Sequence, residues 1–228
     1  MLEVQIFTLY PDLYPGLLDV GIYKKAKKKQ KWSLKIIDIR DYAFDDNRTV
    51  DDTPFGGGSG MLLKPDVVAS ALDKNIKGKE KIIYLSPKGK KLDQKEVKYL
   101  SKLNKINILC GHFEGVGQRL LETRDIEEYS IGDFVLSGGE IGAQLIMDAT
   151  IRLIPDVVGN AAGLIDESFE RHLLEYPLYT HPRVWNNMEV PEVLLSGNHK
   201  KIQMWKLKMS EKLTKLRRPD LWSKYIKS

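Results

Sequence analysis

The chain has 228 residues, a formal net charge of +5 and a single cysteine, Cys110. This length suits one large domain, or one domain with an appendage. One cysteine excludes an intramolecular disulfide, and the four scattered histidines show no zinc-ligand spacing, so a reducing cytoplasm fits. No segment has the pattern of a secretion signal or the apolar length of a membrane span, so we expect neither. The moderate positive charge permits a polyanionic partner without requiring one.

The first two-thirds of the chain alternates short apolar runs with helix-like segments. The apolar runs are rich in β-branched residues and occupy positions 4–9, 34–39, 81–85 and 106–110. Pro, Gly or Asp closes each run, and the segments between them are long enough for helices. This alternation is typical of βα units that feed a parallel sheet. The sequence therefore predicts an α/β domain.

Two helices of this domain carry boundary signals. Asp93 and Glu96 form a D-x-x-E capping pattern ahead of an apolar run, which predicts a helix that follows Asp93. A second helix is expected to run from Glu140 to about Leu153, because Pro155 cannot continue it.

The composition changes after Pro155, where the segment PDVVGNAAGLIDESFE has no clear periodicity. Such a stretch between periodic segments is typical of a connection. We interpret residues 160–170 as a linker between a larger domain, 1–159, and a smaller domain, 171–228.

The clearest helix of the smaller domain begins near Asn198. Apolar residues follow at spacings of three and four, which is the stripe of an amphipathic helix. Lysines lie off this stripe, so we expect a helix with one apolar face and a basic remainder. The stripe consists of Ile202, Trp205, Met209, Leu213 and Leu216.

Glycine is concentrated in the segments PFGGGSGM (54–61), LCGHFEGVG (109–117) and SIGDFVLSGGE (130–140). Loops of this kind let backbone N–H groups approach a ligand closely. Each one alone is more often a tight turn, and none has the pattern of a usual phosphate-binding loop.

Three strand ends are expected to meet at one edge of the sheet. The last two glycine-rich segments each follow an apolar stretch that we assign to a strand, INIL and IGDFVL, and YLSPKG (84–89) ends a third strand. Open α/β folds bind ligands at the carboxyl ends of their strands. We therefore expect one pocket with few charged groups, suited to an adenine and a ribose held by backbone amides and carbonyls.

Several long strings carry a more specific signal. In chain order they are VDDTPFGGGSGM, YLSPKGKKLDQ, LCGHFEG, SIGDFVLSGGE, ESFE, EYPLYTHP, VPEVLLSGNH and LRRPDL. With these strings the chain resembles the bacterial tRNA (guanine-N1)-methyltransferase family over nearly its whole length. The resemblance implies a homodimer of SPOUT-class methyltransferase domains, each with a deep trefoil knot, and a small helical C-terminal domain that binds tRNA.

The activity implied by this resemblance is methylation of N1 of the guanosine immediately 3′ of the anticodon, position 37 of tRNA. S-adenosylmethionine would be the methyl donor. A divalent metal such as Mg²⁺ is compatible with the resemblance, but no cluster of ligand residues in the sequence indicates one.

The resemblance also implies which residues hold the methyl donor, mainly through backbone groups of the three strand ends. Without it, Ile131, Val135 and Leu136 would be assigned to the core of a strand. The implied contacts are Tyr84, Leu85, Ser86, Pro87, Gly111, Glu114, Ile131, Gly132, Asp133, Phe134, Val135 and Leu136, with Gly138 and Gly139 shaping the wall.

The reaction needs a base and a cation. Guanine N1 carries a proton at neutral pH, so a base must remove it while charge builds on the neighbouring carbonyl oxygen. The resemblance assigns the cation to Arg152, which could instead pair with Asp148 at i, i+4. It assigns the base to Glu167, where the family has aspartate, and the neighbouring Asp166 is the alternative.

RNA contacts are implied for the smaller domain, which would press the anticodon arm against the knot of the partner subunit. Arg217 and Arg218 equally suit the C-terminus of a helix, where cations are favoured. His112 replaces the arginine usual in the family and so removes a permanent cation. The implied RNA contacts are Ser196, Gly197, Asn198, His199, Arg217 and Arg218.

Two other interpretations stay open. Another SPOUT enzyme acting on a different RNA base would share the knot, but we would not expect it to carry the ESF segment together with VPEVLLSGNH and LRRPDL. A non-enzymatic RNA-binding module with the same fold is the second alternative, and the presence of Arg152 with a linker carboxylate argues against it.

Overall fold

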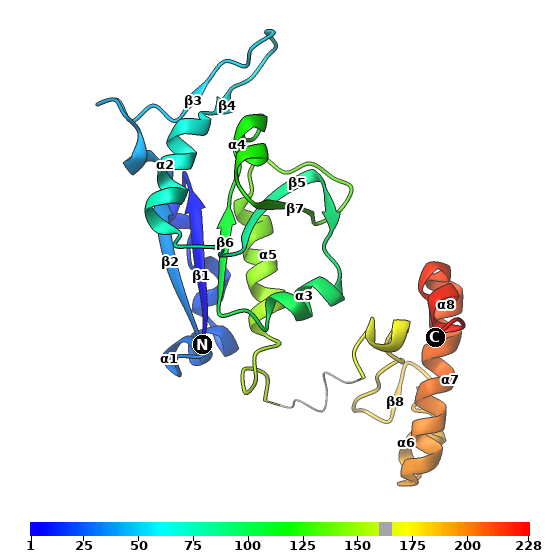
Figure 1. The fold of residues 1–228 in the computed structure, drawn as a ribbon. Helices are drawn as coiled ribbons and strands as arrows, with labels where there is room; N and C mark the ends of the chain where they lie inside the picture. Colours follow the sequence, from blue (N-terminus) through cyan, green and yellow to red (C-terminus); the bar gives the residue numbers. More distant parts are fainter. Residues whose placement is uncertain (160–165) are drawn as a thin grey trace. The chain divides into compact units, whose positions relative to one another are not determined.

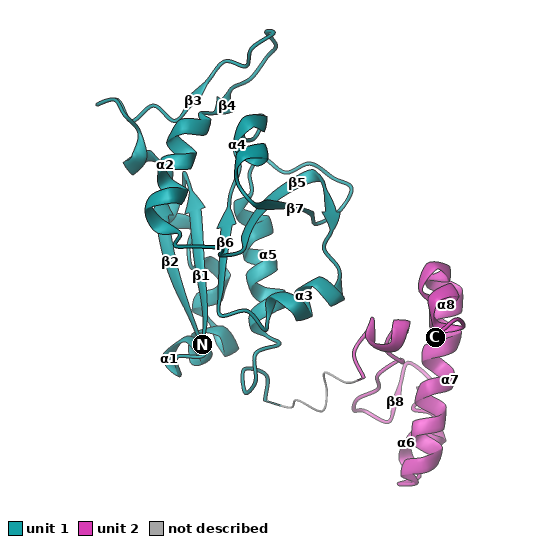
Figure 2. Cartoon of the chain, in the orientation of Figure 1, with its two compact units in different colours: residues 1–159 teal, residues 160–228 magenta. Residues whose placement is uncertain are grey.

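The computed structural model describes residues 1–159 and 166–228. The chain divides into two compact units, Met1–Gly159 and Asn160–Ser228 (Figure 2). Residues 160–165 of the predicted linker lie outside the described residues. Within the described ranges, no helix combines the length and apolarity needed to cross a membrane.

The first unit is built on a five-stranded sheet (Figure 1). Its strand order is β2-β1-β6-β5-β7, and all four neighbouring pairs are parallel. The predicted α/β class with a parallel sheet is confirmed. The strands are β1 (Leu2–Thr8), β2 (Trp32–Asp38), β5 (Ile82–Lys91), β6 (Lys105–Leu109) and β7 (Ile126–Ser130), and a separate short pair is formed by β3 (Asp51–Asp52) and β4 (Leu62–Leu63).

Helices pack on both faces of this sheet. Side chains of α2 (Pro65–Asn75) and α4 (Gln118–Thr123) belong to one apolar cluster. Those of α1 (Gly21–Lys28), α3 (Gln94–Leu100) and α5 (Glu140–Ile151) belong to the other. The predicted cap is present, because Asp93 Oδ1 accepts a hydrogen bond from Glu96 N at 3.0 Å. Short 3-10 helices span Pro11–Leu13, Gly16–Asp19 and Ile39–Tyr42.

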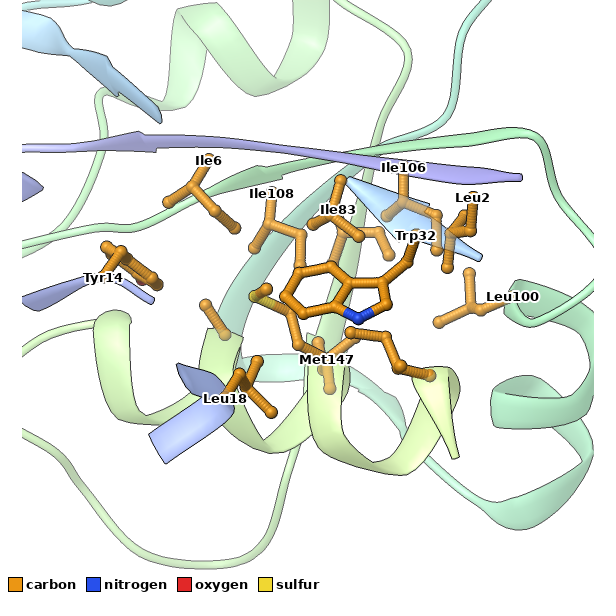
Figure 3. Packing of buried hydrophobic residues seen from close by; sticks show 14 of the residues in the cluster. Leu2, Ile6, Tyr14, Leu18, Trp32, Ile83, Leu100, Ile106, Ile108 and Met147 are labelled. Atoms are coloured by element: carbon orange, nitrogen blue, oxygen red, sulfur yellow. The ribbon is translucent and has the colours of Figure 1, made fainter. Parts of the chain in front are cut away.

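The two clusters arise from the alternation of side chains along each strand. In β1, Val4 and Ile6 enter the cluster with α5, whereas Phe7 enters the cluster with α2. Trp32 is only 1% exposed and lies among the labelled side chains of Figure 3, and its indole N–H donates to Tyr23 O at 2.9 Å. A one-residue slip would turn these side chains to the wrong face, so the core holds the strand ends in fixed register.

The prediction of a strand at IGDFVL is wrong. The last strand is β7, Ile126–Ser130, and residues 131–139 form a loop in which Val135 is 86% exposed. A continuous apolar run is typical of a buried strand, which explains the misassignment. The true strand contains two glutamates because β7 is an edge strand, and Glu127 pairs with Lys81 and Lys90.

The second unit is small and mostly helical. It contains the 3-10 helix Glu170–His172, the hairpin of β8 (Val184–Trp185) and β9 (Met188–Glu189), α6 (Glu192–Leu195), α7 (His199–Arg217) and α8 (Pro219–Tyr225). Asn198 caps α7 by accepting a hydrogen bond from Lys201 N at 3.1 Å. The predicted stripe ends early, because Leu216 is 74% exposed.

Candidate active site

Three loops follow neighbouring strands at the carboxyl edge of the sheet. We call them the β5 loop (86–89), the β6 loop (111–117) and the β7 loop (131–139). The β5 loop bulges out of β5, since the pairing of this strand with β7 jumps from Leu85 to Lys90. Because β6, β5 and β7 are adjacent and parallel, the three loops lie together, as the sequence predicts.

A cavity of about 280 Å³ lies between these loops. The predicted donor contacts all line it, except Asp133, which is exposed on the β7 loop. That these residues bind a ligand stays a prediction. The full lining is Tyr84, Leu85, Ser86, Pro87, Gly111, Phe113, Glu114, Gly115, Tyr129, Ser130, Ile131, Gly132, Phe134, Val135, Leu136, Ser137, Gly138 and Gly139.

Five lining residues are absent from the sequence-based assignment. Phe113, Gly115, Ser130 and Ser137 lie inside the glycine-rich segments, so their neighbours already pointed to them. Tyr129 and Ser130 end β7. Tyr129 was missed because the strand was assigned a few residues too late, and correct placement of β7 would have included it.

Two glycines of the cavity wall lie directly against aromatic rings, where a larger residue would not fit. A Cβ on Gly111 would lie 2.8 Å from Tyr84 Cε2, and a Cβ on Gly132 would lie 2.3 Å from Phe134 Cε1. Gly132 also has a φ of +154°, which side chains other than glycine rarely adopt. Substitution at either position would therefore shift an aromatic ring that lines the cavity.

The cavity wall is almost neutral. Glu114 is the single carboxylate in the lining. Its backbone N–H donates a hydrogen bond of 2.9 Å to Met61 O, at the end of the glycine-rich segment 54–61. Burial raises the pKa of Tyr84. Burial, with a hydrogen bond to Glu96, also raises the pKa of Tyr129. Both phenols therefore stay uncharged, and a ligand with one positive charge would meet one negative group.

Arg152 lies far from this cavity within one chain. It caps the carboxyl end of α5, whereas Gly138 and Gly139 precede the amino end. A helix of this length spans about 18 Å. Burial raises the pKa of the Asp148 carboxyl, and the positive charge of the nearby Arg152 opposes this rise. Asp148 also accepts a hydrogen bond from Tyr23. The structure does not bring Arg152 to this cavity of the same chain.

The two candidate bases lie in a second cavity, of about 300 Å³, within the second unit. Asp166 lies between two cations, 3.8 Å from Arg171 Nη2 and 4.0 Å from Lys206 Nζ. Glu167 lines the same cavity, and its carbonyl accepts a hydrogen bond from Glu170 N at 3.3 Å. Asp166 thus has two cationic neighbours inside its own unit.

The predicted RNA contacts form two groups at opposite ends of α7. Ser196 to His199 lie at its amino end, and Arg217 and Arg218 at its carboxyl end, about 28 Å apart for a helix of this length. Arg218 donates to both carboxylate oxygens of Asp220, at 2.8 and 2.6 Å. It also lies 5.9 Å from the centre of the Phe169 ring, so the LRRPDL segment lies beside the ESFE segment.

A parallel α/β domain with a largely uncharged cavity at three adjacent strand ends is typical of proteins that bind a nucleotide-like cofactor. No group of three or more His, Cys, Asp or Glu side chains that could hold a metal ion occurs in 1–159 or 166–228.

Comparison with known families specifies this class further. The model of the family described as tRNA (Guanine-1)-methyltransferase TrmD matches residues 2–224, and the chain belongs to this family. It is 59% identical to a tRNA (guanine-N(1)-)-methyltransferase of Pelagibacter ubique (strain HTCC1062), over 100% of both chains. Enzymes of the same name from Rhodospirillum rubrum and Ehrlichia canis are 49% and 48% identical, over 99% and 96% of this chain and 94% and 95% of their own.

Proposed function

We propose that this protein methylates N1 of a guanine in tRNA, with S-adenosylmethionine as methyl donor and the guanosine at position 37, 3′ of the anticodon, as target. Membership of the family, together with relatives that bear this activity in their names over the full chain length, carries the proposal. It works where tRNA is made and modified, so we expect it in the cytoplasm.

The methyl-donor cavity suits S-adenosylmethionine. Its volume of about 280 Å³ is near the lower end of ligand pockets. The loops present backbone amides and carbonyls for the adenine and ribose, and Leu85, Ile131 and Phe134 offer apolar surface. Glu114 supplies a negative charge for the positively charged sulfonium or amino group. The deep trefoil knot implied by the family resemblance stays a prediction.

When bound, S-adenosylmethionine supplies an electrophilic methyl group to guanine N1. Glu167 removes the N1 proton as that nitrogen becomes nucleophilic, and Arg152 offsets the charge that develops on the neighbouring carbonyl oxygen. Asp166 is the alternative base, and its carboxylate lies near Arg171 and Lys206.

The homodimer is part of the proposal, and the position of Arg152 supports it. Since this residue lies at the far end of α5 from the cavity of its own chain, a second copy must complete the site. Exposed apolar side chains support such a contact: Leu17 is 77% exposed, Val20 64% and Ile141 64%. Antiparallel packing of α5 against its two-fold mate would bring the Arg152 end of one helix to the cavity end of the other.

The second unit is the tRNA-binding part. Twelve Lys and Arg against eight Asp and Glu give residues 166–228 a net charge of +4, whereas residues 1–159 carry +1. A cationic surface attracts the phosphate backbone and makes binding sensitive to salt.

The deciding experiment is nucleoside mass spectrometry of tRNA after incubation with the protein and S-adenosylmethionine. We expect 1-methylguanosine, and its loss when guanosine 37 is replaced. Another methylated base would favour a different SPOUT enzyme, and donor binding by calorimetry without any product would favour a binding module. A fully active monomer in light scattering would contradict the shared site.

A further inference from the structure

One buried and one largely buried polar side chain connect the β6 loop with the start of α5, behind the wall of the methyl-donor cavity. His112 Nε2 lies 2.7 Å from Glu140 Oε2, and the two side chains are 14% and 5% exposed. Neither residue lines the cavity, but their chain neighbours do, Gly111 and Phe113 on one side and Gly139 on the other. The pair therefore links two walls of one cavity.

The backbone is shaped around this contact. Gly138 forms an antiparallel bridge with His112, and Gly139 N donates to Gly111 O at 2.9 Å. A Cβ on Gly138 would lie 2.4 Å from two atoms of the His112 ring and 2.7 Å from Glu140 Oε2. The glycine at this position leaves the space through which the imidazole reaches the carboxylate.

Glu140 has a second partner on β1, the strand next to β6. Its Oε1 accepts a hydrogen bond from Thr8 Oγ1 at 2.7 Å, at the end of β1. The ring of Tyr10 lies 4.7 Å from the His112 ring, centre to centre. A buried carboxylate is costly unless it is hydrogen-bonded. Here both oxygens have partners, and the first turn of a helix favours a negative charge.

Resting on the proposed function, we propose that His112 and Glu140 are positioning residues that fix the spacing between the β6 loop and the β7 loop for S-adenosylmethionine. A purely structural pair would affect folding stability alone. This pair lies between the two segments whose backbones form the cavity, so loss of its contact changes the shape that the donor meets.

Two substitutions of His112 test the proposal, because both introduce an amide group but the two side chains differ in length. The amide of His112→Gln extends to about the place of Nε2 and can donate to Glu140, whereas the amide of His112→Asn ends one methylene short. We expect His112→Asn to weaken S-adenosylmethionine binding roughly 10- to 100-fold, as for a buried charged group that loses a partner. His112→Gln should stay within about threefold of the wild type.

Calorimetry gives the dissociation constant, and steady-state methylation gives the second readout. The KM for S-adenosylmethionine should rise in His112→Asn, with kcat at saturating donor within about threefold and the KM for tRNA unchanged. Tyr23→Phe is the matched control, since it removes a hydrogen bond to a carboxylate of the same helix, Asp148, away from these loops. It should lower the melting temperature without changing donor affinity.

Equal donor affinity in His112→Asn and wild type, or equal weakening in His112→Asn and His112→Gln, would overturn the positioning role. If His112→Asn does not fold, Thr8→Val takes its place. It removes only the hydrogen bond from Thr8 to Glu140 and should also weaken donor binding. A wild-type protein that neither binds S-adenosylmethionine nor methylates tRNA would instead refute the proposed function.

Discussion

The cavity at the strand ends of the first unit and the cavity of the second unit are of similar size but differ in what lines them. The first is formed by backbone and apolar groups at the ends of strands, with Glu114 as its one carboxylate. Five of the twelve residues that line the second are charged, among them Asp166, Glu167 and Lys206, and four others are leucine or methionine. Under the proposed function this difference is a division of labour, in which the sheet supplies shape for binding and the second unit supplies charge for chemistry and RNA. Four predictions can break or sharpen this contrast.

The largest effect is expected at the proposed base. Glu167→Gln keeps the size of the side chain but cannot accept the N1 proton, and a positioned base contributes ~10²–10⁴-fold in rate. Single-turnover methylation should fall by about that factor, while binding of tRNA and donor stays nearly normal.

Asp166→Asn is the matched control for this experiment and should be much milder. A large loss of methylation rate in Asp166→Asn, with a nearly normal rate in Glu167→Gln, would show that Asp166 and not Glu167 is the base. Normal rates in both variants would assign proton removal to another group or to water.

Substitutions of two glycines in the β6 loop test whether the shape of the cavity in the first unit determines donor binding. Gly111→Ala places a methyl group 2.8 Å from the Tyr84 ring, whereas a Cβ on Gly117 has ordinary 3.6 Å contacts with Pro65. We expect donor affinity in calorimetry to fall at least about tenfold for Gly111→Ala and to stay unchanged for Gly117→Ala. Equal affinities in the two variants would mean that the cavity is not the donor site.

The division of labour itself is tested by a fragment of residues 1–159, which contains all of the larger sheet and both apolar clusters. The fragment should bind S-adenosylmethionine with nearly full affinity and have little affinity for tRNA. Binding by the full chain should weaken steeply with salt. Full tRNA affinity in the fragment, measured by filter binding, would move the RNA site to the first unit.

The smallest effect concerns Arg218. A two-point hydrogen bond from Arg218 lowers the pKa of Asp220 to about 2. Because the folded-state pKa is depressed, this pair stabilises the protein above the ordinary aspartate pKa, and the contribution is lost as pH falls towards 2. Carboxyl NMR titration should find this low pKa, and Arg218→Ala should return it to the ordinary range.

Asp220→Asn extends the test to RNA, because it frees the guanidinium. It should raise tRNA affinity by no more than about threefold, as expected for an exposed pair. A loss of affinity would mean that the carboxylate positions Arg218 for RNA.

The sequence predicted the sheet and most of the residues that line the cavity at its strand ends, for a local physical reason. Strand ends and glycines are visible in short windows, and parallel strands must bring their carboxyl ends to one edge. The β7 loop was assigned to a strand because Phe134, Val135 and Leu136 form an apolar run, and nothing local reveals that they line a cavity instead. Exposure of such a run is a property of the tertiary fold.

Other features depend on tertiary packing between residues that are far apart in the sequence. The separation of Arg152 from the cavity follows from the direction of α5, and the proximity of Arg218 to Phe169 follows from the packing of α8. The contact of His112 with Glu140 spans 28 positions, so spacing rules for helices and strands could not have found it.

The burial of Trp32 gives the protein a built-in optical reporter. This indole is 1% exposed in the first unit, and the other three tryptophans, at 185, 205 and 222, lie in the second. Trp185 is 62% exposed. A variant that keeps only Trp32 would fluoresce from an apolar environment until the sheet opens, and a Trp32→Phe variant would emit only from the smaller unit. Denaturation followed in both variants would therefore measure separately how cooperatively each half unfolds.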